Sequence, residues 1–88
     1  MGLDGYEFLL WTEKNFGIEI PNQDATRILA VGELAKYISE RLVQIEGFKA
    51  PSSRTVFAVL KEELVRQFRL QPDKITPESQ FVRDLGIN

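Results

Sequence analysis

Residues 81–88 read FVRDLGIN and close a long segment, residues 69–88, in which Pro72 and Pro77 prevent a continuous helix. Irregular segments of this length are uncommon in a small domain and are often functional. Apolar residues nevertheless recur along the segment, which indicates a loop that packs against a core. These anchors are Leu70, Ile75, Phe81, Val82 and Leu85.

Before this loop the sequence predicts a helix over residues 53–68, since apolar residues recur there at helical spacing. We expect Glu62 and Arg66 to form an ion pair on its surface, worth roughly 0.2–0.5 kcal/mol. Upstream, residues 46–52 contain a glycine and a proline and are predicted to be a linker. The buried stripe of the helix is predicted as Phe57, Leu60, Leu64 and Phe68.

The N-terminal half predicts three more helical segments. Residues 4–15 form the first, with Asp4 as N-cap, Glu7 completing a capping pair, and Gly17 as the stop. Tyr6, Leu9, Leu10 and Phe16 form one apolar stripe at helical spacing, and Phe8 and Trp11 lie outside it but are expected in the core. The helix is therefore apolar around much of its circumference, which predicts either deep burial or a second apolar face open to partners.

The second segment is a short helical turn over residues 23–29, started by Asp24, with Ile28 and Leu29 turned inward. Residues 31–45 give the clearest amphipathic helix, although Ala30 is a weak residue at its start. The predicted buried stripe of this third helix is Val31, Leu34, Ala35, Ile38, Leu42 and Ile45.

The composition limits the possible functions. With 88 residues, 43% hydrophobic and 27% charged, the chain can form one soluble domain with one core. It has no cysteine and no histidine, so disulfides, thiolate sites and the commonest general base are excluded. No apolar run is long enough for a membrane span, and no basic stripe suggests nucleic acid. We expect a cytoplasmic protein.

The catalytic templates also fail. Ser52 and Ser53 have no histidine to activate them, and no phosphate-binding glycine loop or calcium loop occurs. We predict no catalytic residue and no metal site, so the chain is not expected to be an enzyme. A carrier, a binding module and an interaction scaffold remain as function classes.

Two segments together suggest a family. Residues 65–88 resemble the end of the first helix and the long first loop of acyl and peptidyl carrier proteins, up to the motif Asp-Leu-Gly-x-Asp-Ser-Leu. Residues 3–21 resemble the second helix of that family, ending in Phe-x-x-x-Ile-Pro at Phe16, Ile20 and Pro21. The helices after Pro21 resemble its third and fourth helices, so the resemblance covers about nine tenths of the chain.

The order of these parts is rotated relative to the family. The resemblance implies an all-α, four-helix acyl-carrier-like bundle of three longer helices and one short, with a long ordered loop, circularly permuted. Residues 1–88 would be one carrier-like domain: residues 1–45 as family helices two to four, residues 46–52 as linker, and residues 53–88 as helix one and its loop. A fragment of a tandem array and a dimer that exchanges halves remain as alternatives, but a self-contained, monomeric permutant is favoured because no motif residue is missing or duplicated.

The attachment position is where the sequence departs from the family. Joining Asn88 to Gly2 aligns Gly2 with the serine that carries 4'-phosphopantetheine, and Leu3 and Asp4 continue the motif. Glycine has no hydroxyl, so this chain is not expected to be loaded, although the resemblance implies 4'-phosphopantetheine as the cofactor of the family. The serines of the chain lie elsewhere in the pattern and are poor substitutes: Ser39, Ser52, Ser53 and Ser79.

The resemblance implies a carrier that holds thioester intermediates for fatty acid, polyketide or nonribosomal peptide synthesis. Its expected partners are a phosphopantetheinyl transferase and the synthase enzymes, and the alternative is a non-loadable docking or scaffold module. Trp11, Thr12 and Lys14 make the second helix less acidic than in fatty-acid carriers, which favours a polyketide or peptide pathway. The partner-binding candidates are Leu3, Asp4, Tyr6, Glu7, Leu10 and Glu13 on that helix, with Asp84, Gly86 and Asn88 on the loop side.

Overall fold

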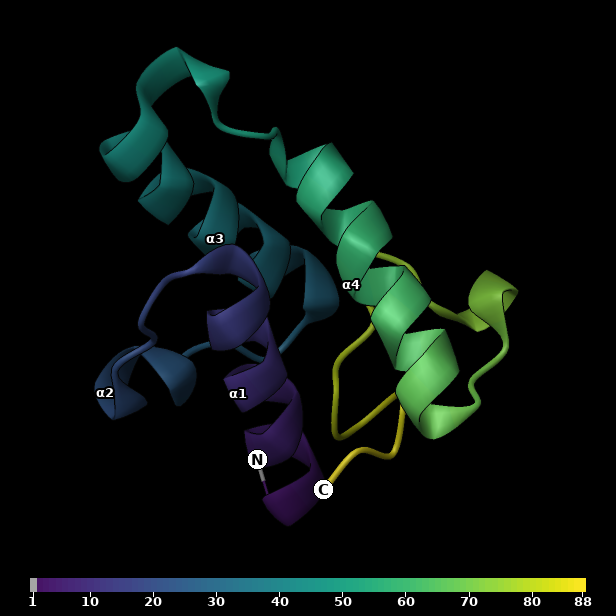
Figure 1. Ribbon diagram of the computed structural model, residues 1–88. Helices are drawn as coiled ribbons and strands as arrows, with labels where there is room; N and C mark the ends of the chain where they lie inside the picture. Colours follow the sequence, from purple (N-terminus) through teal and green to yellow (C-terminus); the bar gives the residue numbers. More distant parts are fainter. Residues whose placement is uncertain (1) are drawn as a thin grey trace.

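Residues with helical periodicity form helices in the computed structural model, which describes residues 2–88. No strand occurs within these residues, and Ala30 and Gln80 form only an isolated antiparallel bridge. Three long helices and one short one confirm the predicted all-α class (Figure 1). The elements are α1 (Leu3–Phe16), α2 (Asn22–Ala25), α3 (Val31–Glu46), η1 (Gly47–Lys49), α4 (Ser53–Phe68) and η2 (Pro72–Lys74), where η is a 3-10 turn.

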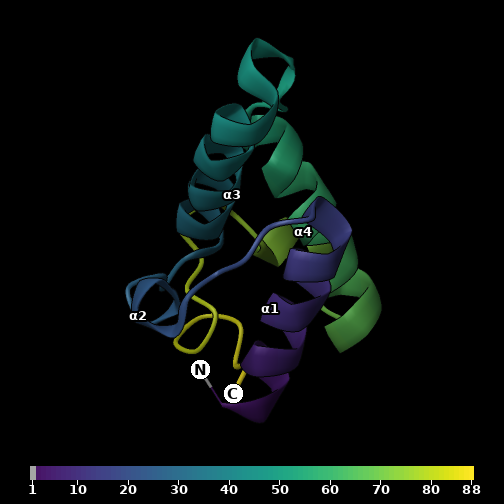
Figure 2. The ribbon, with the colours of Figure 1, turned by 60° about the vertical axis from the view of Figure 1, so that its left-hand side comes forward.

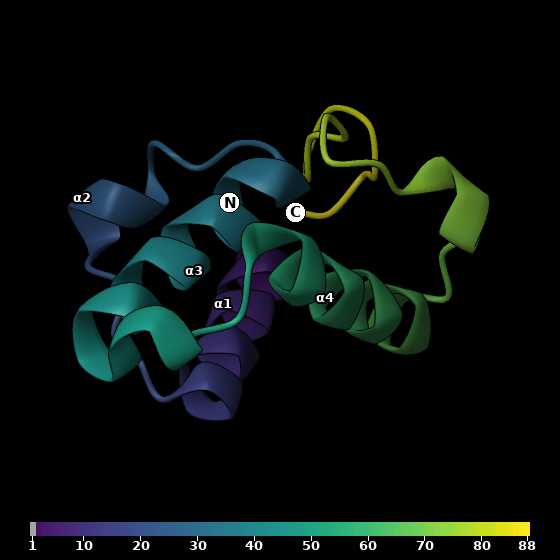
Figure 3. The same cartoon turned by 90° about the horizontal axis from the view of Figure 1, so that it is seen from above.

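Helices α3 and α4 lie side by side and are joined at one end by η1, as Figures 1 and 3 show. The amphipathic pattern of α3 is confirmed by its five buried residues, Val31, Leu34, Ala35, Ile38 and Leu42. Ile45 is the exception: it is 65% exposed, because α3 continues past the part of the helix that the core covers. The side chain of Ala30 cannot cap α3, and the Glu33 carboxylate instead accepts its N–H at 2.8 Å.

Helix α1 buries only part of its apolar surface. The buried positions are Gly5, Phe8 and Thr12, whereas Tyr6 is 54% exposed and Leu10 is also exposed. Of the two alternatives, the exposed second face therefore applies to Tyr6 and Leu10, whereas Phe8 lies in the core as expected and Trp11 packs half-buried against it. Gly17 ends the helix in the left-handed conformation, as predicted.

The predicted cap of α1 was wrong. The helix begins at Leu3 with Gly2 at the N-cap position, and no side chain caps it. Asp4 lies within the first turn instead. The reason is that a backbone carbonyl from the far end of the chain, that of Asn88, already accepts the N–H of Gly5 at 2.6 Å.

Helix α4 begins as predicted, with the Ser52 hydroxyl accepting the Thr55 N–H at 3.2 Å. Its fully buried apolar residues are Val56, Leu60 and Leu64, while Phe57 and Phe68 are half-buried. The expected Glu62–Arg66 pair does not form. Arg66 instead forms a two-bond ion pair with Glu63, with N–O distances of 3.0 and 2.8 Å, because Glu63 lies three positions away and its carboxylate reaches the same guanidinium.

Residues 69–88 form an ordered loop tied to the start of α3 by backbone hydrogen bonds. The N–H groups of Val31 and Gly32 donate to the carbonyls of Ser79 and Pro77. Ile75 and Phe81 are buried as predicted, whereas Val82 is 53% exposed and Ile87 takes the inward place nearer the end. Leu29, expected to point inward with Ile28, is 55% exposed, because its backbone carbonyl turns toward the loop and accepts the Phe81 N–H.

Candidate site at the junction of Gly2 and Asn88

The two ends of the described chain lie side by side, as Figures 1 and 2 show from two directions. Gly5 donates its N–H to the Asn88 carbonyl at 2.6 Å, and Tyr6 donates to Gly2 at 2.9 Å. If Asn88 directly preceded Gly2, the Gly5 bond would join residues four apart, as α-helical bonds do. The Asn88 carbonyl therefore serves as an acceptor for the first turn of α1, beside the N-cap residue Gly2.

Gly2 itself does not fit the attachment of 4'-phosphopantetheine. It has no hydroxyl, and a Cβ built on it would lie 2.7 Å from the Asn88 carbonyl carbon. A serine at this position would therefore displace the backbone of Asn88. The two side chains that flank Gly2 in sequence on the helix side, Leu3 and Asp4, are both exposed.

The other serines have structural roles or lie away from this junction. Ser39 donates to the Pro51 carbonyl at 2.8 Å, and Ser52 caps α4. Ser79 is buried, accepts the Thr76 N–H and donates to the Lys74 carbonyl. Ser53 is exposed, but it opens α4 at the end opposite to the junction (Figure 1).

The outer face of α1 carries the predicted partner-binding residues. Leu3 is 73% exposed, and Tyr6 and Leu10 are exposed beside it. Asp4 and Glu7 are exposed on the same helix. This surface, which we call the α1 face (Leu3, Asp4, Tyr6, Glu7 and Leu10), combines apolar side chains with two carboxylates and no base.

Glu13 differs from the α1 face because its carboxylate is used within the fold. Its Oε2 accepts the Ile20 N–H at 2.7 Å, which fixes the extended link after α1 and places Ile20 in the core. Glu13 therefore positions the Phe-x-x-x-Ile-Pro segment.

We expect Glu13→Ala to lower the free energy of unfolding by about 1–2 kcal/mol, because the Ile20 N–H loses a charged acceptor in a partly buried place. Glu19→Ala is the matched control, since Glu19 is exposed in the same link, and it should change stability by less than about 0.5 kcal/mol. Urea denaturation measures both. Equal effects would contradict the role given to Glu13.

Asp84 and Gly86 shape the turn that ends at Asn88. The Asp84 carboxylate accepts the Gln80 N–H at 2.8 Å and two bonds from Arg83 at 3.0 and 3.1 Å. Gly86 has φ +67, a conformation that glycine adopts most easily. Both candidates therefore lie next to the junction, and the turn they form brings Asn88 to α1.

These contacts predict a pH effect. The Arg83 guanidinium, and then the Gln80 N–H, hold the pKa of Asp84 below its ordinary value of 3.8. A carboxylate with a lower pKa in the folded chain stabilises the fold above pH 3.8, and this contribution is lost as pH falls through the folded pKa. The free energy of unfolding of Asp84→Asn should therefore fall less steeply than that of the unaltered chain from about pH 5 to about pH 3. Identical slopes in acid titrations followed by urea denaturation would contradict this.

A small cavity that the sequence did not indicate adjoins the α1 face. It has a volume of about 150 Å³ and is lined by Tyr6, Leu9, Asn22, Ala25 and Thr26. Its walls come from α1 and from α2 with the residue that follows it, so residues of the second segment join the site. No pattern in the sequence marks the α2 residues, because the cavity exists only once α2 packs beside α1.

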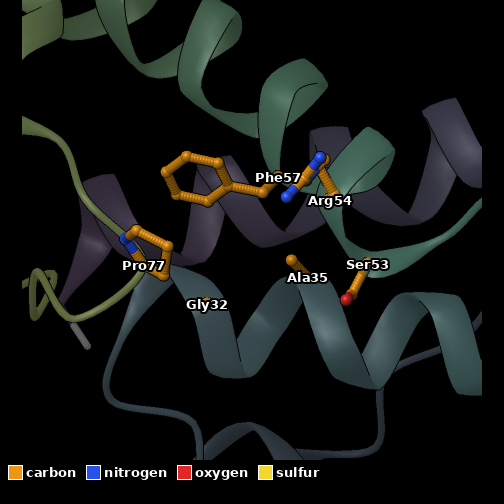
Figure 4. Close-up of a pocket in the computed structure, with 6 residues that line it drawn as sticks. All are labelled: Gly32, Ala35, Ser53, Arg54, Phe57 and Pro77. Carbon is orange, nitrogen blue, oxygen red and sulfur yellow. The ribbon is translucent and has the colours of Figure 1, made fainter.

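A larger cavity lies away from the junction, between α3, α4 and the loop. Its volume is about 360 Å³, and Figure 4 shows Phe57, Pro77 and Ala35 around it, with Ser53 and Arg54 beside them.

Residues 2–88 hold no group of three or more acidic, histidine or cysteine side chains suited to a metal ion. Within the same residues, no helix has the length and apolar character needed to cross a membrane.

Comparisons with known proteins locate a partial similarity. Over 38 residues, 43% of this chain, the sequence is 42% identical to the acyl carrier protein of Helicobacter pylori strain 26695 and 45% identical to that of Helicobacter acinonychis strain Sheeba. Part of this chain is similar to acyl carrier proteins. Over 39 residues it is also 44% identical to the acyl carrier protein of Rickettsia massiliae strain Mtu5.

The alignments cover 49% of the Helicobacter proteins and 45% of the Rickettsia protein. The chain thus spans about half the length of the curated relatives it matches. No family model matches the chain, and no solved structure matches it. The similarity supports the acyl carrier family for the matched part.

Proposed function

We propose that this chain is a carrier-protein domain in circularly permuted order. The observation that carries the proposal is the Gly5–Asn88 hydrogen bond, which holds the end of the loop against the first turn of α1. The alignment lengths are consistent with it. An alignment that keeps the order of residues can follow only one part of a rotated chain. The matched length is 38–39 residues, which is close to the length of either part, 45 residues in 1–45 and 36 residues in 53–88.

In this proposal the chain holds and presents an intermediate, and partner enzymes perform the chemistry. The α1 face and the turn at Asp84 and Gly86 bind the phosphopantetheinyl transferase and the synthase enzymes. The two carboxylates of the α1 face suit basic partner surfaces, and its exposed Leu3, Tyr6 and Leu10 supply apolar contact area.

We assign the cargo to the acyl class, because the relatives are named acyl carrier proteins. Two of the three residues that favour a polyketide or peptide pathway have a structural role in α1. Thr12 is fully buried and Trp11 stacks on Phe8 at 5.7 Å, so packing explains both residues. Only Lys14 remains as a surface difference from a more acidic helix.

The chain as written is expected to remain unloaded, since Gly2 offers no hydroxyl. After incubation with coenzyme A and a broad-specificity phosphopantetheinyl transferase, its intact mass should be unchanged. A gain of one phosphopantetheine arm would contradict this expectation and show that another serine serves.

A rearranged chain tests the carrier proposal directly. It consists of residues 46–88, a serine, and then residues 3–45, which is the order of the family. The added serine supplies the hydroxyl. It is bonded directly to Asn88, so the clash between a Cβ at position 2 and the Asn88 backbone does not arise. We expect this chain to keep the helix content and to gain one arm, whereas a version with alanine for the added serine gains none. A rearranged chain that folds and is never loaded would overturn the carrier proposal.

The second candidate function is a docking module that keeps the carrier surface and omits the arm. The absence of a hydroxyl at Gly2, together with an intact α1 face, favours it. Binding to synthase enzymes by the unaltered chain, with no loading of the rearranged one, would support this alternative.

A further inference from the structure

Residues 47–52 are the covalent connection between two halves that complete one core. The half formed by residues 2–46 supplies Phe8, whose ring lies 6.2 Å from Phe68 and 5.9 Å from Phe81, both in residues 53–88. The bridge between Ala30 and Gln80 also joins the halves. Neither half can bury these side chains without the other.

The connection is held by the Ser39–Pro51 hydrogen bond and by the partly buried Ala50, while its turn is exposed. Phe48 is 96% exposed, and Ile45, at the end of α3, is 65% exposed, so neither packs on the core. Ala50 and Ser52 already have extended backbones, which leaves η1 as the part that makes the chain turn back. Six residues can span up to about 20 Å when straight, enough to carry the halves apart.

Gly47 is the conformational key to this turn. It has φ +69 and ψ −142, a region that residues with a Cβ rarely adopt. A Cβ at Gly47 would meet no atom within 4 Å, so only the backbone conformation restricts this position. In a straightened connection the residue would be free to leave that conformation.

We infer that residues 47–52 act as a hinge through which two copies of this chain exchange halves and form a swapped dimer. Each core in the dimer contains residues 2–46 of one copy and residues 53–88 of the other, with the same contacts between the two halves as in the monomer. The charges of the two halves suit their contact in monomer and dimer alike, since residues 2–46 carry eight acidic and four basic side chains and residues 53–88 carry five and six. The inference does not depend on the carrier function.

A matched pair of glycine variants tests the hinge. Gly47→Ala strains the closed turn of the monomer and is relieved in the swapped dimer, so the dimer association constant should rise about 30-fold or more, corresponding to at least about 1 kcal/mol at each of two hinges. Gly17 has the same φ of +69 and equally open space, but it lies within one half. Gly17→Ala therefore strains both states equally and should leave the association constant unchanged.

Sedimentation over a range of concentrations measures these constants, and a cysteine pair shows whether the dimer is swapped. The chain has no cysteine, and Ala30 and Gln80 are a bridged pair from opposite halves. Such pairs without mutual hydrogen bonds have Cα atoms about 4.5 Å apart, which suits a disulfide.

Ala30→Cys with Gln80→Cys, oxidised in the isolated dimer fraction, should give covalent dimers on a denaturing gel and covalently closed monomers in the monomer fraction. Covalently closed monomers from the dimer fraction would show ordinary surface docking and overturn the inference. Equal association constants for Gly47→Ala and Gly17→Ala would overturn it as well.

Discussion

Phe8→Ala should lower the free energy of unfolding by about 3–5 kcal/mol, the range for removing a buried aromatic ring. Phe8 is fully buried, and its ring faces Trp11, Phe68 and Phe81, so it joins α1 to α4 and to the loop. A domain of this size has a total stability of about 4–13 kcal/mol. If the unaltered chain has a stability near the lower end of that range, the variant should be largely unfolded.

Tyr6→Ala is the matched control, because Tyr6 is an aromatic residue of the same helix and is 54% exposed. It should change stability by less than about 1 kcal/mol. Urea denaturation followed by circular dichroism gives both values. A loss below about 1 kcal/mol for Phe8→Ala would contradict the assignment of the buried face of α1.

Gly32→Ala should destabilise the fold by about 1–3 kcal/mol, although alanine usually stabilises a helix relative to glycine by about 1 kcal/mol. The Cβ of alanine would lie 2.7 Å from the Pro77 carbonyl oxygen and 2.8 Å from its Cβ. Figure 4 shows Pro77 of the loop directly beside Gly32. The loop backbone would have to retreat and lose the Gly32–Pro77 hydrogen bond of 2.8 Å.

Ala58→Gly provides the control for this sign reversal. Ala58 is exposed within α4, so glycine there should lower stability by the ordinary helix preference of about 1 kcal/mol. Thermal or urea unfolding of the two variants should thus show alanine favoured at position 58 and glycine favoured at position 32. An increase in stability for Gly32→Ala would contradict the close contact between α3 and the loop.

The sequence predicted the helices better than it predicted the buried face of α1. In α3 the apolar residues recur at helical spacing with polar residues between them, and the expected stripe is buried except at Ile45. Helix α1 is apolar around much of its girth, so periodicity cannot choose a face. Thr12 has a polar side chain, yet it is fully buried, and its hydroxyl group donates to the Phe8 carbonyl at 2.9 Å.

Part of the candidate site was also predictable from the sequence, and part of it was not. The meeting of Asn88 with Gly2 was predictable from motif residues. The acceptor role of Glu13 toward Ile20 and the α2 wall of the small cavity depend on how segments pack, which no local pattern encodes. The exposed Tyr6 and Leu10 could not be separated from core residues by sequence for the same reason.

The Gly5–Asn88 bond couples the start of α1 to the end of the loop. The first turn of a helix has N–H groups without helical partners, and here the loop supplies one acceptor. Opening of the loop therefore exposes the amide of Gly5 to solvent exchange together with that of Phe81, which the loop holds against Leu29. In hydrogen exchange the two ends of the chain therefore open as one cooperative unit, although they are the most distant parts of the sequence.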